Sequence, residues 1–128
     1  MSKKQFRVII AGSRKYDDYQ RLKEKCNRIL SAKFADPEAE VIIVSGHASG
    51  ADALGERYAA ERSLKTDIHP ADWNKYGRAA GPRRNAETAA VADALIAFPK
   101  AGEENRGTKN MVKLTRDKGL SIRIISEK

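Results

Sequence analysis

Short runs of apolar residues alternate along this chain with segments whose apolar residues recur at the spacing of a helix. The runs at 6–11, 40–45 and 93–98 are almost wholly apolar, which is typical of strands covered on both faces of a sheet. A shorter, more polar strand is expected at 66–69, and a last strand at 120–125. The pattern therefore predicts five strands.

Helical spacing predicts two helices in the first half of the chain. Asp17 or Asp18 can cap the first of them, and Asp36-Pro37 ends it. Ser49 and Asp52 have the spacing of a capping box. This box predicts a second helix that reaches about residue 62.

The second half predicts two more helices around an irregular segment. Residues 70–81 show no clear periodicity and are expected to form a loop. Pro82 suits the first turn of a helix to about residue 92, Thr108 can cap the last helix, and Gly119 can end it. Strands and helices then alternate throughout residues 1–128, which predicts a single α/β domain with a doubly wound, mainly parallel five-stranded sheet.

Composition narrows the class of protein. The 128 residues suffice for one hydrophobic core but not for two. The apolar runs are too short to span a membrane and the first residues do not resemble a signal peptide, so a cytoplasmic protein is expected. Cys26, the only cysteine, falls at an apolar helix position and is expected in the core. Neither a metal site nor a cofactor is predicted.

The charge balance is basic. The chain carries 25 Lys and Arg against 17 Asp and Glu, a formal net charge of +8. Such an excess suits phosphate ligands or nucleic acid. The basic residues are scattered, however, and five never follow one another. A solvated basic surface is therefore an equally valid interpretation, and nucleic acid stays an alternative partner to a small anion.

Three strands run directly into turns suited to holding phosphate. A glycine lets backbone N–H groups approach a ligand, and a following helix points its positive dipole end at that ligand. Because such turns lie on one edge of a parallel sheet, we expect them to form one cleft. The alternative is three ordinary strand-to-helix turns, with Asp52 only a capping residue. The expected binding residues of these turns are Gly12, Ser13, Arg14, Gly46, Ser49, Gly50, Asp52, Gly107 and Thr108.

Arg83 and Arg84 follow Gly81-Pro82 in the first turn of the third predicted helix. The helix dipole disfavours cations there by about 0.3–1 kcal/mol each. Two arginines at this end therefore suggest an anionic ligand, with Asn85 placed to hydrogen-bond a base or sugar. The alternative is a solvated pair that reaches past the helix end.

Other chemistry-bearing residues are less informative. His47 is interpreted as polar lining of the second turn, and His69 as structural. Trp73 could stack on a base, but we expect it to anchor its loop to the core. Glu103 and Glu104 could supply a carboxylate to the site, or form a surface loop.

With these motifs in place, the chain resembles the SLOG superfamily, the Rossmann-like fold of DprA/Smf proteins and LOG phosphoribohydrolases. Within it the chain is most similar to the YspA/YpsA-related branch. The resemblance implies a Rossmann-like domain that binds nucleotide-derived molecules, and LOG-like relatives often dimerise, so a homodimer is left open. The matching segments are Gly12–Arg14, Ser45–Asp52, Pro70–Trp73, Gly77–Asn85, Ala92–Pro99 and Gly107-Thr108.

The chain departs from the LOG enzymes at one position. Their motif Pro-Gly-Gly-x-Gly-Thr-x-x-Glu ends in a glutamate that acts in cleaving the N-glycosidic bond, and Met111 stands at that place here. The resemblance keeps an arginine, Arg84. We therefore expect a binding or sensing module for a nucleoside monophosphate, ADP-ribose or NAD-related compound. A phosphoribohydrolase using Asp52, Glu87 or Glu103, or a DprA-like binder of single-stranded DNA, is the alternative; whether the chain is an enzyme stays open.

Overall fold

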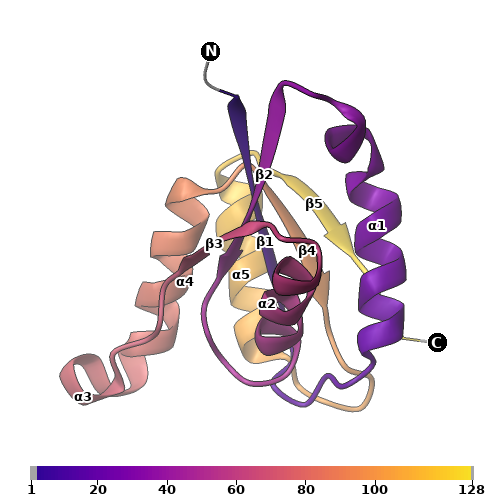
Figure 1. Ribbon diagram of the computed structural model, residues 1–128. Coiled ribbons are helices and arrows are strands. Elements are labelled where there is room, and N and C mark those ends of the chain that lie inside the picture. Colours follow the sequence, from indigo (N-terminus) through magenta and orange to yellow (C-terminus); the bar gives the residue numbers. More distant parts are fainter. Residues whose placement is uncertain (1–2, 128) are drawn as a thin grey trace.

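Strands and helices alternate along the chain in a computed structural model that describes residues 3–127. No helix among these residues has the length and apolar character needed to cross a membrane. Figure 1 labels the elements. They are β1 (Lys4–Gly12), α1 (Tyr19–Ala35), β2 (Ala39–Ser45), α2 (Ala51–Glu61), β3 (Lys65–Ile68), α3 (Trp73–Tyr76), the 3₁₀ helix η1 (Gly77–Ala79), α4 (Ala80–Val91), β4 (Ala94–Phe98), α5 (Arg106–Asp117) and β5 (Ser121–Ile124).

The five strands form one sheet in the order β3-β2-β1-β4-β5, and every pairing is parallel. This arrangement confirms the doubly wound, Rossmann-like α/β fold. The chain moves outward from β1 through β2 to β3 and then returns to the other side of β1 as β4. The strand order therefore reverses between β1 and β4, which is where ligands bind in open α/β sheets.

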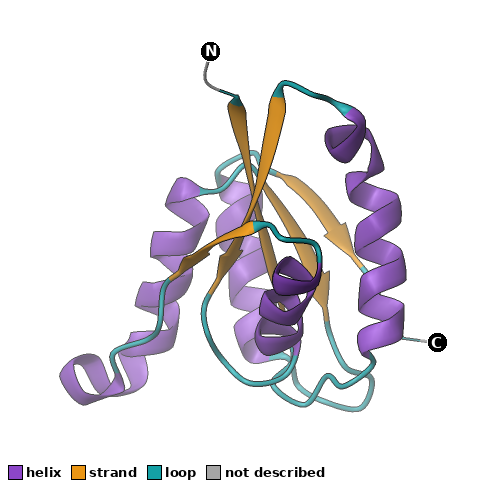
Figure 2. Cartoon of the chain, in the orientation of Figure 1, coloured by secondary structure: helices purple, strands orange, loops and turns teal. Residues whose placement is uncertain are grey.

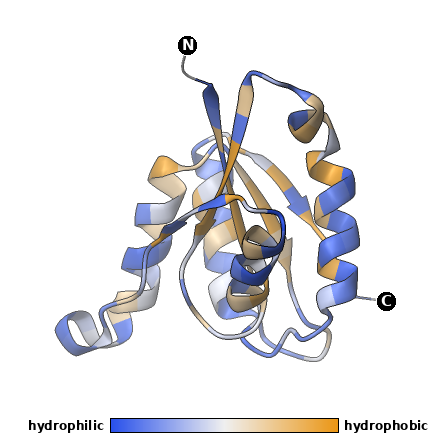
Figure 3. Ribbon diagram, in the orientation of Figure 1, coloured by the Kyte–Doolittle hydropathy of each residue, from blue (hydrophilic) through white to orange (hydrophobic). Residues whose placement is uncertain are grey.

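Both faces of the sheet are covered, as the apolar runs predict. Val8 and Ile10 of β1 pack on the side of α1 and α2, whereas Ile9 and Ala11 pack on the side of α5. The apolar residues lie in the central strands and on the inward sides of the helices (Figure 3). Alternate residues of a strand point to opposite faces, so one continuous apolar run fills two cores.

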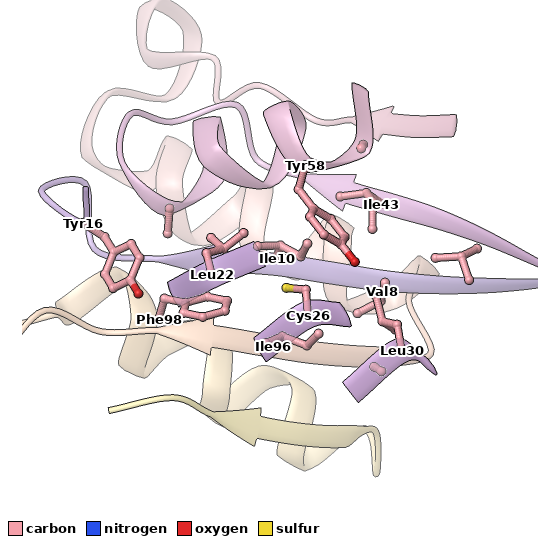
Figure 4. Close-up of a cluster of buried hydrophobic side chains, with 14 residues drawn as sticks. Val8, Ile10, Tyr16, Leu22, Cys26, Leu30, Ile43, Tyr58, Ile96 and Phe98 are labelled. Atoms are coloured by element: carbon pink, nitrogen blue, oxygen red, sulfur yellow. The ribbon is translucent and has the colours of Figure 1, made fainter. Parts of the chain in front are cut away.

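The larger core lies between the sheet and the α1–α2 layer (Figure 4). The rings of Tyr16 and Phe98 meet in it with centroids 5.3 Å apart. Cys26 is fully buried there, which confirms its placement in the core. Burial raises the pKa of its thiol to about 12, so Cys26 is a packing residue rather than a reactive thiolate.

Two predicted helix caps are wrong. Asp18 does cap α1, since its Oδ1 accepts from the Arg21 N–H at 3.1 Å. The capping residue of α2 is Gly50, however, not Ser49, and that of α5 is Asn105, not Thr108. Within the described part of the chain, both helices begin without a side-chain capping bond, so no side chain there caps their first N–H groups.

The predicted loop at 70–81 is also wrong. Asp72 accepts a hydrogen bond from the Lys75 N–H at 3.0 Å and opens α3, which η1 joins to α4. One-turn helices bury too little apolar surface to show a periodicity, which is why the sequence pattern missed them. Trp73 consequently lies on a short helix beside the start of α4 (Figure 1).

Candidate functional site

A cleft of about 610 Å³ lies at the carboxyl ends of the central strands. The loops after β1, β2 and β4 meet at this edge, at the bottom of the view in Figure 2. Its size falls in the usual range for small-molecule sites, about 300–1,000 Å³. The structure thus brings together, along its lining, nine predicted residues: Gly12, Ser13, Arg14, Gly46, Asp52, Arg84, Asn85, Gly107 and Thr108.

Two predicted binding residues hold the loops together instead of lining the cleft. The Ser49 hydroxyl lies 3.4 Å from the Arg14 carbonyl oxygen, and the Ala51 N–H donates to the Ser13 carbonyl at 3.0 Å. Gly50 has a φ of +74°, and a Cβ there would overlap the Ser13 carbonyl oxygen. Glycine at position 50 therefore allows the second turn to pack directly on the first.

The two arginines of α4 have different environments, and both lie further from the start of the helix than predicted. Because α4 begins at Ala80 and continues from η1, Arg83 is its fourth residue and Arg84 its fifth. Arg83 stacks its guanidinium 4.0 Å from the centroid of the Tyr76 ring and does not line the cleft among residues 3–127. The helix dipole acts only weakly at these positions, so the feature that distinguishes Arg84 is its burial.

Arg84 is a buried cation, with 9% of its surface exposed. Its Nη1 donates to the Gly46 carbonyl at 2.5 Å and its Nε to the Asn85 Oδ1 at 2.9 Å. Burial lowers its pKa, while the charge of Asp52 acts in the opposite direction. A guanidinium remains charged throughout the physiological range, so Arg84 places a fixed positive charge in the wall of the cleft.

Asp52 supplies the opposing negative charge from the first turn of α2. It is 6% exposed, and its Oδ2 accepts from the Ala48 N–H at 3.2 Å. Burial raises the pKa of this carboxyl, and the Ala48 bond and Arg84 partly offset that effect. Its hydrogen bond runs to Ala48 rather than to Ser49, so the carboxylate organises the β2–α2 loop, which borders the cleft.

Asn85 ties the start of α5 to α4. Its Nδ2 donates to the Asn110 Oδ1 at 2.9 Å and to the Gly107 carbonyl at 3.3 Å. Sequence reasoning missed Asn110, which also lines the cleft. Its position one helical turn after Gly107 was the available signal. These bonds hold the amino end of α5 against α4 at the cleft.

Thr108 has an unsatisfied hydroxyl at that amino end. The residue is 6% exposed, lines the cleft, and its Oγ1 has no hydrogen-bond partner among residues 3–127. The N–H groups of the first helical turn lie beside it, because Thr108 is the third residue of α5. Buried hydroxyls are rarely left unpaired, so this group is placed to bond a ligand oxygen.

Carboxylates near the cleft lie mainly at its rim. Met111, at the position of the LOG glutamate, is buried in the lining and its sulfur lies 3.8 Å from the Thr88 hydroxyl. Glu103 and Glu104 line the rim, and Glu103 pairs with Lys15 at 3.3 Å. This ion pair joins the β1–α1 loop to the β4–α5 loop. Lys15 was not recognised as a cleft residue from the sequence.

Trp73 also lines the cleft, and the expectation that it anchors a loop in the core is wrong. The indole remains 48% exposed, with the Arg14 guanidinium 5.2 Å from its ring centroid.

The two histidines lie elsewhere among polar partners. His47 contacts Glu56 at 2.9 Å, and His69 contacts Asp67 at 3.0 Å.

Fold and cleft together define a Rossmann-like α/β protein with its site at the reversal of the strand order. The model of the YspA, cpYpsA-related SLOG family matches residues 6–76, from β1 through α3. The chain belongs to this family.

Two further comparisons give the extent of the likeness. The Gene 61 protein of Mycobacterium phage D29 is 29% identical over 122 residues, which are 91% of this chain and 93% of the phage protein. The X-ray structure of DNA processing protein A (DprA) from Streptococcus pneumoniae matches 93% of this chain with a TM-score of 0.53 and 16% identity. This chain spans 58% of the DprA chain, and the likeness shows the fold alone.

Proposed function

We propose that residues 1–128 form one binding module for a nucleotide-derived small molecule, such as a nucleoside monophosphate, ADP-ribose or an NAD-related compound, and that it serves as a sensor. The observation that carries this proposal is the buried hydroxyl of Thr108 at the amino end of α5, which has no hydrogen-bond partner within residues 3–127. Together with Gly107 and the free N–H groups of that turn, it offers several hydrogen-bond donors and a helix dipole to one anionic group.

The charges around the cleft support a phosphate-containing ligand. Arg14 and Arg84 bring two guanidinium groups to the lining. The other charged lining residues pair with one another, Lys15 with Glu103 and Arg106 with Glu104. Asp52 is left to balance the two arginines, and its burial disfavours ionisation. Burial lowers the pKa of Arg84, and the charge of Arg14 adds a smaller effect in the same direction. An anionic ligand would relieve this repulsion between the two arginines.

The same geometry favours a small molecule over single-stranded DNA. Binding sites for single strands combine an open basic groove with several stacking aromatic side chains. Here the Lys15–Glu103 pair spans the rim, and Trp73 is the only aromatic residue that lines the cleft within residues 3–127. DNA binding is retained as an alternative outcome of the test.

Calorimetric titration of the chain with AMP, ADP-ribose, NAD⁺ and a single-stranded oligonucleotide tests the proposal. We expect saturable binding of at least one of the three nucleotides, with a rise in the thermal unfolding midpoint. A ligand at 100 times its Kd adds about 2.7 kcal/mol to the stability of the native state. Binding of the oligonucleotide alone, with no response to the nucleotides, would replace this function by DNA binding.

A further inference from the structure

Among the residues that the structure describes, Trp73 supplies the one large aromatic surface that the cleft presents to a ligand. Trp73 is 48% exposed although it lines the cleft, and it is the only tryptophan in the chain. An aromatic side chain of this size normally gains more by burial against protein. Its exposure at a concave site therefore points to a contact that a ligand completes.

Two neighbours hold the indole in place. On one side the Arg14 guanidinium lies 5.2 Å from the ring centroid. On another side the ring lies against the backbone of α4, because a Cβ added to Gly81 would come within 3.3 Å of the Trp73 Cη2. The position of the ring is thus set before any ligand arrives, which lowers the entropy lost on binding.

The wall around the indole differs in chemistry from the wall around Thr108. Apart from the Arg14 guanidinium, the lining beside Trp73 comes from Gly81 and Pro82, which bring no charged or amide side chain. The α5 wall instead offers the hydroxyl of Thr108 and N–H donors. A ligand that satisfies both walls needs an anionic group and a flat apolar ring.

We propose that Trp73 is the base-recognition residue of the cleft, and that an aromatic nucleobase stacks on its indole ring while the phosphate of the same ligand lies at the amino end of α5. This proposal rests on the proposed function, because it specifies which part of a nucleotide the cleft reads. It predicts that the base, and not only the ribose phosphate, contributes to affinity. Arg14, in the loop between β1 and α1, orients the indole ring of Trp73.

The single tryptophan makes the proposal directly measurable. AMP and ribose 5-phosphate share the sugar and the phosphate and differ in the base. Titration of the wild-type chain with AMP should quench and shift the Trp73 emission, excited where the nucleotide does not absorb. Ribose 5-phosphate should bind more weakly and leave the emission almost unchanged.

Variants then separate stacking from a structural role. Trp73→Leu should weaken AMP binding roughly 5- to 150-fold, the range of base–aromatic stacking, and leave ribose 5-phosphate binding unchanged. Trp73→Phe should restore part of the affinity for AMP. Tyr76→Leu is the matched control, because Tyr76 belongs to the same short helix but does not line the cleft among the described residues.

The outcomes are distinguishable. AMP binding without a change in Trp73 emission, or an equal loss of both ligands in Trp73→Leu, would overturn base stacking and leave the proposed function intact. Failure of AMP, ADP-ribose and NAD⁺ alike to bind the wild-type chain would overturn the proposed function and this proposal with it.

Discussion

Replacing Thr108 by valine removes the hydroxyl on which the proposed phosphate site depends and preserves the shape of the side chain. In the chain without ligand, the Thr108 Oγ1 is buried and has no partner among residues 3–127. A buried donor left unsatisfied costs about 1–3 kcal/mol, and an apolar group of the same shape avoids that cost. We therefore expect the unfolding midpoint of Thr108→Val to stay constant or rise, by roughly 3–5 °C for each kcal/mol gained.

Ligand binding should change in the opposite direction. A hydrogen bond to a charged group contributes about 1.5–3 kcal/mol. Its loss should weaken AMP binding about 10- to 150-fold. Calorimetric titration gives the Kd, and a thermal scan of the same samples without ligand gives the midpoint. A gain in stability together with a loss of affinity is expected of a binding group and not of a packing residue.

Thr115 provides the matched control on the same helix. It is fully buried, and its Oγ1 donates to the Met111 and Val112 carbonyl oxygens at 2.9 and 3.1 Å. Thr115→Val should lose about 0.5–1.5 kcal/mol of stability and bind AMP normally. If Thr108→Val behaved like Thr115→Val, with a lower midpoint and unchanged affinity, the reasoning would be refuted.

Three further predictions concern the walls of the cleft. Gly50→Ala should destabilise the chain by more than 1 kcal/mol in chemical denaturation, roughly the cost of a left-handed alanine. The φ of Gly50 is +74°, and the added Cβ would clash with Ser13. Gly107→Ala should not destabilise the chain in this way, because a Cβ at Gly107 would meet open space. Burial raises the pKa of Asp52, so the folded state holds that proton more tightly than the unfolded state, and ionisation destabilises the fold as pH rises. Asp52→Asn should thus raise the midpoint at neutral pH and lose this advantage below about pH 4; an advantage that persists in acid would contradict the assignment. An assay for free base from nucleoside monophosphates should show no turnover near the usual enzyme range of about 1–10³ s⁻¹, since Met111 offers no charge to an oxocarbenium ion. Such turnover, lost in Asp52→Asn or Glu103→Gln, would make the chain a hydrolase.

The architecture followed from the sequence because its strongest signals are local. Continuous apolar runs such as 6–11 occur where helices cover both faces of a parallel sheet, and β1 and β4 indeed have residues in both cores. The capping residues of α2 and α5 did not follow. Ser49 fits a capping box, yet its hydroxyl lies beside the Arg14 carbonyl of another loop, a contact that no local pattern encodes.

The location of the candidate site could be predicted from the sequence, but the role of each residue in it could not. A parallel sheet brings Gly12, Gly46 and Gly107 to one edge, and all three line the cleft. Arg83 and Arg84 were both chosen for their position at a helix start, and Arg84 also for its match to the LOG enzymes. What distinguishes Arg84 in the structure is burial against the Gly46 carbonyl. Trp73 was misassigned because whether an aromatic residue faces a core or a cleft depends on packing between α3 and α4, which residue spacing does not show.

Amide chemical shifts of the isotope-labelled chain, recorded as AMP is added, test the central claim most directly. We expect the perturbed amides to lie around the cleft, at Gly12–Arg14, Gly46–Ala48, Trp73 and Gly107-Thr108, while those of α1 and β5 stay unchanged. Perturbations concentrated on the basic outer side of α5, at Lys109, Lys113 and Arg116, or no saturable perturbation at all, would contradict a nucleotide site at the carboxyl edge of the sheet.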